Sequence, residues 1–161
     1  MPVKNGFFME KLVLFVCTGN TCRSPMAEAW FNHRAAELGL SGFRAASAGL
    51  YAAPGAPASP QAREVMREAG VALDDFHSRP LTGAMLAAAE LVVAMTDGHR
   101  RKILAAAPEL RDRCFRLADF AESTDIADPY GGTTEVYRQC FDAMRPALEH
   151  LIEQLRNSSV K

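Results

Sequence analysis

A cysteine and an arginine stand six positions apart in one short segment, and this pair can carry out nucleophilic chemistry on a bound anion. Residues 16–25 read Val-Cys-Thr-Gly-Asn-Thr-Cys-Arg-Ser-Pro, with the pair at Cys17 and Arg23. A thiolate is an effective nucleophile, and a guanidinium presents a planar fork that can bind two phosphoryl oxygens. We therefore expect Cys17 to attack a phosphorus atom that Arg23 holds in place.

The residues between this cysteine and arginine favour a tight loop that binds an anion. Gly19 and Asn20 tolerate unusual backbone angles, and a tight loop that leads into a helix can direct several N–H groups to one point. The helix N-terminus adds partial positive charge there, and the same field favours thiolate over thiol at Cys17. The expected phosphate-binding loop comprises Thr18, Gly19, Asn20, Thr21, Cys22 and Ser24.

A proton donor for the leaving group is expected in the segment 128–132, which reads Asp-Pro-Tyr-Gly-Gly. The proline stiffens this segment, and the glycines allow it to fold over a pocket. An aspartic acid beside the aromatic ring of Tyr130 would be partly desolvated, which favours its protonated form. We expect Asp128 to act as the general acid, with Asp125 as the alternative.

The elements that must position these residues alternate between strands and helices. Apolar runs at 12–16, 43–48, 90–95 and 113–117 predict strands. Amphipathic patterns and helix-start signals predict helices over 24–38, 60–69, 82–89, 97–107 and 134–156. This order predicts a single α/β domain with a parallel sheet covered on both faces. Ligands of such sheets bind beyond the carboxyl ends of strands, so the loop after the first strand is the natural site.

Local signals indicate where two of these helices begin and that a third is exposed to solvent. Ser24 is predicted to be an N-cap, with Pro25 at the first helical position, and Ser59-Pro60 predicts a second start of the same kind. The helix over 97–107 carries three consecutive basic residues and is predicted to be solvent-exposed.

Size, charge and composition limit the classes of function. The chain has 161 residues, a net charge of −1, 48% hydrophobic and 23% charged residues, which suits one globular domain. We predict a domain over residues 9–161 after a short extension over residues 1–8. The near-neutral charge gives no reason to expect nucleic acid or a membrane surface as a partner. No signal-like or membrane-spanning segment is recognised, so we expect a cytoplasmic protein. The oligomeric state is left open.

The remaining cysteines and the histidines do not suggest a metal site. Cys114 and Cys140 are expected to be small buried apolar residues. The histidines form no ligand-spaced pair, so each is expected to be a surface or capping residue and no metal is expected. These histidines are His33, His77, His99 and His150.

Residues 16–25 resemble the signature of the low-molecular-weight protein tyrosine phosphatases. Residues 128–130 resemble the acid loop of that family, and Ser47-Ala48-Gly49 resembles its segment after the second strand. The similarity runs from about residue 11 to residue 156. It implies a four-stranded parallel sheet flanked by helices, phosphorylated proteins as substrates, and hydrolysis without a metal or cofactor.

The resemblance also implies catalytic roles. It assigns Cys17 as the nucleophile, Arg23 as the phosphate ligand and Asp128 as the general acid and then the general base. It further implies that Cys22 can form a reversible disulfide with Cys17 under oxidation, which would protect the nucleophile from irreversible oxidation. Simple packing is the alternative role for Cys22.

A supporting hydrogen-bond network is implied for Asn20, Ser24 and Ser47, with the Ser24 hydroxyl helping the thiolate to leave. Many members of the family add a histidine to this network. Here that position is Phe76, and His77 follows it. The departure puts the role of the histidine in doubt for this chain.

The residue at position 21 bears on the substrate. Tyrosine-directed members usually carry a larger aliphatic residue where this chain has Thr21, and threonine there resembles the bacterial protein arginine phosphatases. Residues 95–96 and 131–132 fit that subgroup too. A phosphoguanidinium is broad near the phosphorus, so a small threonine would leave room for it. We favour phosphoarginine, with phosphotyrosine as the alternative, in a pocket that includes Thr21, Tyr51 and Tyr130.

Two other readings stay open at this stage. Arsenate reductases that share this loop use thiol-redox chemistry, but they need further cysteines nearby, and residues 82–97 contain none. A non-catalytic phosphate-binding module is the second alternative. The presence of Cys17, Arg23 and Asp128 together argues against it.

Overall fold

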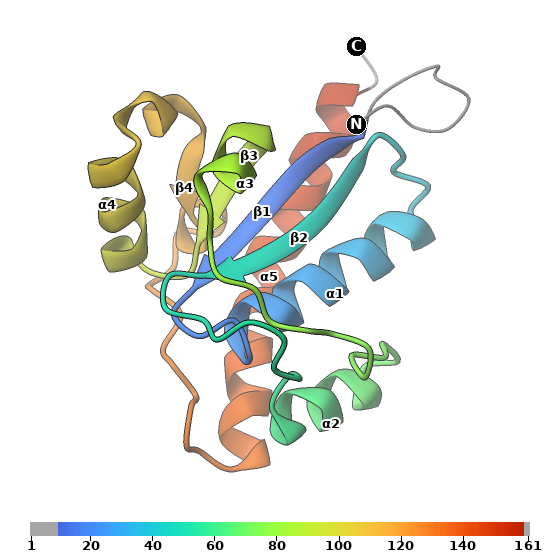
Figure 1. Cartoon of the computed structure of the whole chain (residues 1–161). Coiled ribbons are helices and arrows are strands. Elements are labelled where there is room, and N and C mark those ends of the chain that lie inside the picture. The colour runs from blue at the N-terminus through green and yellow to red at the C-terminus, as the bar shows by residue number, and fades with distance from the viewer. Residues whose placement is uncertain (1–9, 160–161) are drawn as a thin grey trace.

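The sheet of this protein has four parallel strands, as the resemblance implied. The structure is a computed structural model that describes residues 10–159, so the predicted extension over residues 1–8 lies outside the described residues. The strands follow the order β2-β1-β3-β4 across the sheet (Figure 1). Their bounds are Lys11–Cys17 for β1, Phe43–Gly49 for β2, Ala89–Ala94 for β3 and Cys114–Arg116 for β4.

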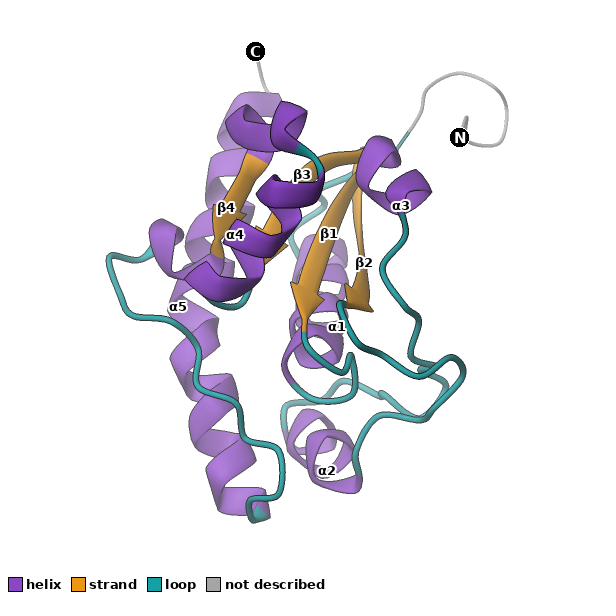
Figure 2. Cartoon of the chain, turned by 60° about the vertical axis from the view of Figure 1, so that its left-hand side comes forward, coloured by secondary structure: helices purple, strands orange, loops and turns teal. Residues whose placement is uncertain are grey.

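Helices cover both faces of the sheet (Figure 2). One face packs against α1 and α5, and the other packs against α3 and α4, while α2 packs against α1 and α5. The α-helices span Arg23–Glu37 (α1), Pro60–Glu68 (α2), Gly83–Ala88 (α3), Asp97–Ala106 (α4) and Thr134–Ser159 (α5). Two short 3₁₀ helices, Pro108–Arg113 and Leu117–Phe120, flank β4. No helix of residues 10–159 is long and apolar enough to cross a membrane.

The apolar sequence of β1 explains why this strand lies in the interior. Successive side chains of a strand point to opposite faces. Val13 and Phe15 accordingly pack with the α1 and α5 side, whereas Leu14 and Val16 pack with the α3 and α4 side. All four are at most 1% exposed, which confirms the prediction of a sheet buried on both faces.

The strand order reverses next to β1. The chain passes from β1 to β2 on one side, then crosses to β3 on the other side of β1. Cys17 at the end of β1 pairs with Gly49 at the end of β2, so both strands end at the same edge (Figure 1). Residues 47–49, which were compared with a segment after the second strand, are instead the last three residues of β2. The loop after β1 lies at the switch point where ligands bind in such folds.

The prediction that Ser24 is an N-cap and Pro25 the first helical residue is wrong. Helix α1 begins at Arg23 with Cys22 as its N-cap residue, and no side chain caps it. Ser24 does not cap this helix because its hydroxyl bonds inside the loop. The predicted start at Ser59 is confirmed, since its side chain accepts from the amide of Ala62.

Helix α4 is also less exposed than its basic sequence suggests. His99 and Ile103 of this helix are buried, at 8% and 1% exposure. They lie four positions apart and therefore share one side of the helix. The basic residues occupy the other sides, so α4 is exposed on its outer surface only.

Candidate active site

The loop between β1 and α1 folds around the sulfur of Cys17. Asn20 adopts a left-handed backbone with a φ of 57°, and its amide donates to Cys17 Sγ at 3.3 Å. The carbonyl of Cys17 accepts from the Leu50 amide at 3.0 Å, and the carbonyl of Thr18 accepts from the Tyr51 amide at 2.9 Å. The backbone of residues 50–51, which follow β2, therefore holds the loop through these hydrogen bonds. The left-handed backbone of Asn20 agrees with the expectation that this residue adopts an unusual backbone angle.

A network of side chains lies beneath the sulfur. Ser24 Oγ is 2.8 Å from Cys17 Sγ, and Asn20 Nδ2 donates to Ser24 Oγ at 2.8 Å and to Ser47 Oγ at 3.0 Å. The amide of Arg79 donates to Asn20 Oδ1 at 2.9 Å, which fixes the orientation of the side-chain amide. Because Ser24 Oγ accepts from Asn20, its hydrogen is free to point at the sulfur. The residues expected in this network thus lie together.

The network continues to a carboxylate that sequence reasoning missed. Ser47 Oγ donates to Glu28 Oε1 at 2.6 Å. Burial raises the pKa of Glu28, and the hydrogen bond from Ser47 opposes this shift. Phe76, where the resemblance leads us to expect a histidine, packs in the core, and His77 beside it is exposed. The sequence offered one signal, since Glu28 lies four residues after Ser24 on the same helix.

Arg23 lies beside the loop and is almost fully buried, at 4% exposure. Its Nη1 donates to the carbonyl of Ile126 at 2.9 Å, and its Nη2 lies 3.6 Å from Asp128 Oδ2 and 3.5 Å from Thr18 Oγ1. Its Nε has no hydrogen-bond partner among the described residues. A buried, unpaired N–H of a cation is well suited to an oxyanion.

A cavity of about 240 Å³ opens above the loop. It is lined by residues 17–23 together with Asp128 and Tyr130. Asp128 Oδ1 accepts from the Tyr130 amide at 3.1 Å, which holds the carboxylate at the cavity. Asp125 instead accepts from the Asp97 amide and from Arg116, both at 3.1 Å. Asp128 is therefore better placed than Asp125 to exchange a proton with a ligand in this cavity.

Of the three residues expected in the substrate pocket, the structure brings two to this cavity. Thr21 and Tyr130 line it, whereas Tyr51 is not among its lining residues. Tyr51 is 69% exposed, and its hydroxyl accepts from Lys102 Nζ at 3.1 Å. A contact between Tyr51 and a substrate would thus involve parts of the substrate that lie outside the cavity.

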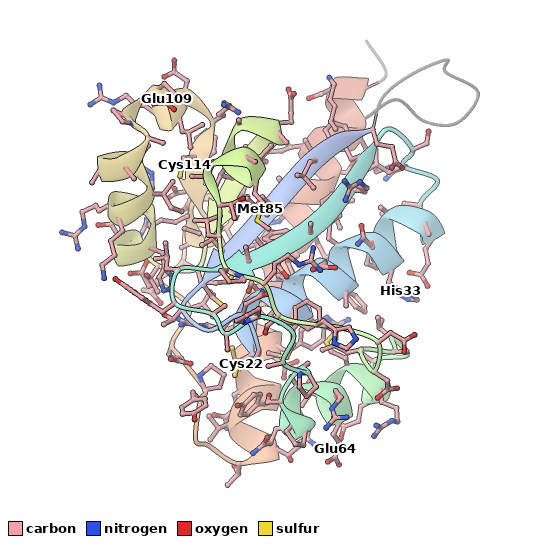
Figure 3. All side chains as sticks on the ribbon, viewed as in Figure 1. Cys22, His33, Glu64, Met85, Glu109 and Cys114 are labelled. Atoms are coloured by element: carbon pink, nitrogen blue, oxygen red, sulfur yellow. The ribbon has the colours of Figure 1, made fainter. Side chains whose placement is uncertain are left out.

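All four cysteines are free and buried. Cys22 lines the cavity, and its Sγ lies 3.1 Å from the Tyr137 hydroxyl, whose pKa is raised to about 12 by burial. Cys114 is the first residue of the edge strand β4 and lies well apart from Cys22 (Figure 3). Burial raises the pKa of the Cys114 thiol, and that of Cys140 to about 12. Both therefore match the expected small apolar residues, and Cys114 is too distant to act as a thiol relay.

His99 was expected at the surface or as a cap, and this prediction is wrong. Its Nε2 lies 2.8 Å from Thr18 Oγ1, inside the site. Burial lowers the pKa of His99 to about 4, and the charge of Arg23 acts in the same direction. A usable signal was present, because Thr96 caps α4 at the carboxyl end of β3 and so places residue 99 next to the end of β1.

Comparisons with known proteins agree with this geometry. The model of the family "Low molecular weight phosphotyrosine protein phosphatase" matches residues 12–161. A protein-arginine-phosphatase of Bacillus subtilis is 40% identical over 146 residues, which are 89% of this chain and 96% of that protein. A probable low molecular weight protein-tyrosine-phosphatase of Ralstonia nicotianae, EpsP, is 32% identical over 92% of this chain and 98% of its own length.

A solved structure gives the same result at the level of the fold. It shows the arginine phosphatase YwlE as a cysteine-to-serine mutant with a phosphorylated active site serine. The TM-score is 0.85 at 40% sequence identity, and the match covers 90% of this chain and 95% of that chain.

Proposed function

Because this chain belongs to the low molecular weight phosphotyrosine protein phosphatase family, we propose that it dephosphorylates proteins through a phosphocysteine at Cys17 and prefers phosphoarginine. The observation that carries the proposal is the cavity in which Cys17, Arg23 and Asp128 meet. Its substrates would be phosphorylated proteins of the cytoplasm. The phosphorylated serine in the mutant YwlE structure supports a covalent intermediate in a relative of the same fold.

The first step forms the covalent intermediate. The Cys17 sulfur attacks phosphorus in line with the leaving group, so a sulfur–phosphorus bond forms while the phosphorus–nitrogen or phosphorus–oxygen bond breaks. Asp128 gives its proton to the departing nitrogen or oxygen. The loop amides and the unpaired Nε of Arg23 stabilise the charge on the equatorial oxygens.

The second step releases phosphate. The carboxylate of Asp128 now takes a proton from a water molecule, whose oxygen attacks phosphorus. The sulfur–phosphorus bond breaks, inorganic phosphate leaves and the thiolate of Cys17 is restored. The Ser24 hydroxyl, 2.8 Å from the sulfur, donates to the negative charge that builds up on the leaving thiolate.

The preference for phosphoarginine rests on the side of the cavity formed by Thr21. This residue is small, carries a hydroxyl and lines the cavity next to the loop amides. Higher identity to the Bacillus subtilis protein-arginine-phosphatase than to EpsP, 40% against 32%, supports the same assignment. One such pocket contact is worth about 1–3 kcal/mol, which is enough for a preference.

The test compares phosphoarginine and phosphotyrosine peptides of one sequence. We expect the wild type to favour phosphoarginine in kcat/KM, and Thr21→Ile to lose at least about tenfold of that preference because the larger side chain narrows the cavity. Cys17→Ser is expected to abolish turnover of both peptides. A wild type that strongly favours phosphotyrosine would overturn the substrate assignment, and an active Cys17→Ser variant would overturn the mechanism.

A further inference from the structure

The first turn of α4 contacts the phosphate-binding loop through one side chain. His99 Nε2 lies 2.8 Å from Thr18 Oγ1, and the same oxygen lies 3.5 Å from Nη2 of Arg23. Thr18 also lines the cavity. The backbone that carries the imidazole is held by the cap of α4, since the His99 amide donates to Thr96 Oγ1 at 3.1 Å. A chain of contacts therefore leads from α4 through Thr18 to the guanidinium.

The surroundings of the ring define its state. Nδ1 of His99 is buried and has no hydrogen-bond partner among residues 10–159. A buried N–H without an acceptor is rarer than a buried lone pair without a donor, so the proton of the neutral ring belongs on Nε2. In that tautomer His99 donates to Thr18 Oγ1. The oxygen keeps a second lone pair for the guanidinium of Arg23.

On the basis of the proposed phosphatase activity, we infer that His99 is a positioning residue that acts as a neutral hydrogen-bond donor and holds Thr18 and Arg23 in the geometry that binds the phosphoryl group. The segment 50–51 restrains Thr18 through its backbone carbonyl, and His99 restrains it through its side chain. Loss of this second restraint frees the threonine side chain beside the reacting group.

The charges that face the ring explain why it must stay neutral. Arg23 of α1 and Lys102 of α4 disfavour a positive charge there, whereas Asp128 and Asp125, which precede α5, favour one. Burial and Arg23 prevail, so the imidazolium is disfavoured at neutral pH. A protonated His99 would place a second cation next to the guanidinium and an N–H without an acceptor at Nδ1.

The experiment measures inhibition by inorganic phosphate together with the hydrolysis of p-nitrophenyl phosphate in the full chain. We expect His99→Ala to weaken phosphate binding and to lower kcat/KM by about 10- to 100-fold, because the ligand-binding groups lose their alignment. His99→Gln can place an amide donor near the position of Nε2 and is expected to recover most of the loss. His33→Gln, a substitution on α1 away from the cavity, is the matched control.

A double-variant cycle separates positioning from general structural damage. In Thr18→Val, which lacks the hydroxyl, the further change His99→Ala is expected to cost less than about twofold, since its partner is already gone. The inference would be overturned if the double variant lost kcat/KM by the product of the two single-variant losses. It would also be overturned if His99→Ala bound phosphate within about twofold of the wild-type affinity. An inactive wild type would instead contradict the proposed phosphatase function.

Discussion

At the scale of single residues, the surroundings of the sulfur distinguish Cys17 from Cys114 and Cys140. Cys17 Sγ receives the Asn20 amide and lies within 2.8 Å of the Ser24 hydroxyl. The thiols of Cys114 and Cys140 lie in surroundings that raise the pKa and keep them protonated. The cysteine and the arginine could be predicted from their spacing, and the aspartate from the Asp-Pro-Tyr-Gly-Gly segment in which it lies. His99 and Glu28 were missed because their side-chain partners lie 81 and 19 positions away, and the local signals alone do not show which residues they contact.

The network beneath the sulfur yields a prediction for Glu28. Because burial raises its pKa, the folded state still binds a proton at pH values where the unfolded chain has lost it. Folding stability therefore falls as the pH rises from the ordinary carboxyl pKa of about 4 through the raised value. Glu28→Gln keeps an acceptor for Ser47 without the buried charge. We expect a melting temperature at pH 7 that equals or exceeds that of the wild type, with a weaker pH dependence.

Turnover should respond to the same substitution in the opposite direction. A neutral amide accepts more weakly from Ser47, so the chain through Asn20 to Ser24 loosens and kcat is expected to fall about tenfold. Glu37→Gln is the control, since Glu37 also lies on α1 but is exposed and pairs with Arg34. A Glu28→Gln variant with wild-type kcat, measured beside this control, would show that the carboxylate has no part in the network.

At the scale of elements, the sequence predicted the order and type of the strands and α-helices because each carries a clear apolar period or a cap. Ser59 did cap its helix, but Ser24 did not, because tertiary hydrogen bonds to Cys17 and Asn20 use its oxygen. The exposed appearance of α4 was misleading for a similar reason. Its buried side is narrow, and only its packing against β3 and β4 reveals it.

The end of β2 gives a prediction at this scale. A Cβ atom added at Gly49 would lie 2.6 Å from the carbonyl oxygen of Thr18, so the phosphate-binding loop would have to move. We expect Gly49→Ala to lower kcat/KM by more than about tenfold and stability by about 1–3 kcal/mol. Gly83→Ala is the control, because nothing lies within 4 Å of its added Cβ. Steady-state kinetics and thermal melts would measure both, and an active, stable Gly49→Ala protein would contradict the tight fit.

At the scale of the whole molecule, the strand order brings distant segments of the chain to one edge of the sheet. The loop after β1, the end of β2, the start of α4 and the segment 126–130 all contribute to the site. Alternation of strands and helices predicted the parallel sheet and the edge that carries the loop. It could not predict which residues from later segments meet there, since that depends on how each connection crosses the sheet.

The most direct test of this account is mass spectrometry of the phosphorylated enzyme after rapid acid quench or quench at low temperature. Asp128→Ala slows the hydrolysis of the intermediate. With p-nitrophenyl phosphate, whose p-nitrophenolate leaves without needing a proton, the intermediate still forms and should therefore accumulate. We expect one added phosphoryl group per chain, located on Cys17 by peptide fragmentation and absent from Cys17→Ser. Release of phosphate without any phosphorylated Cys17 would contradict the mechanism. So would a phosphoryl group on another residue that forms and disappears at the rate of turnover.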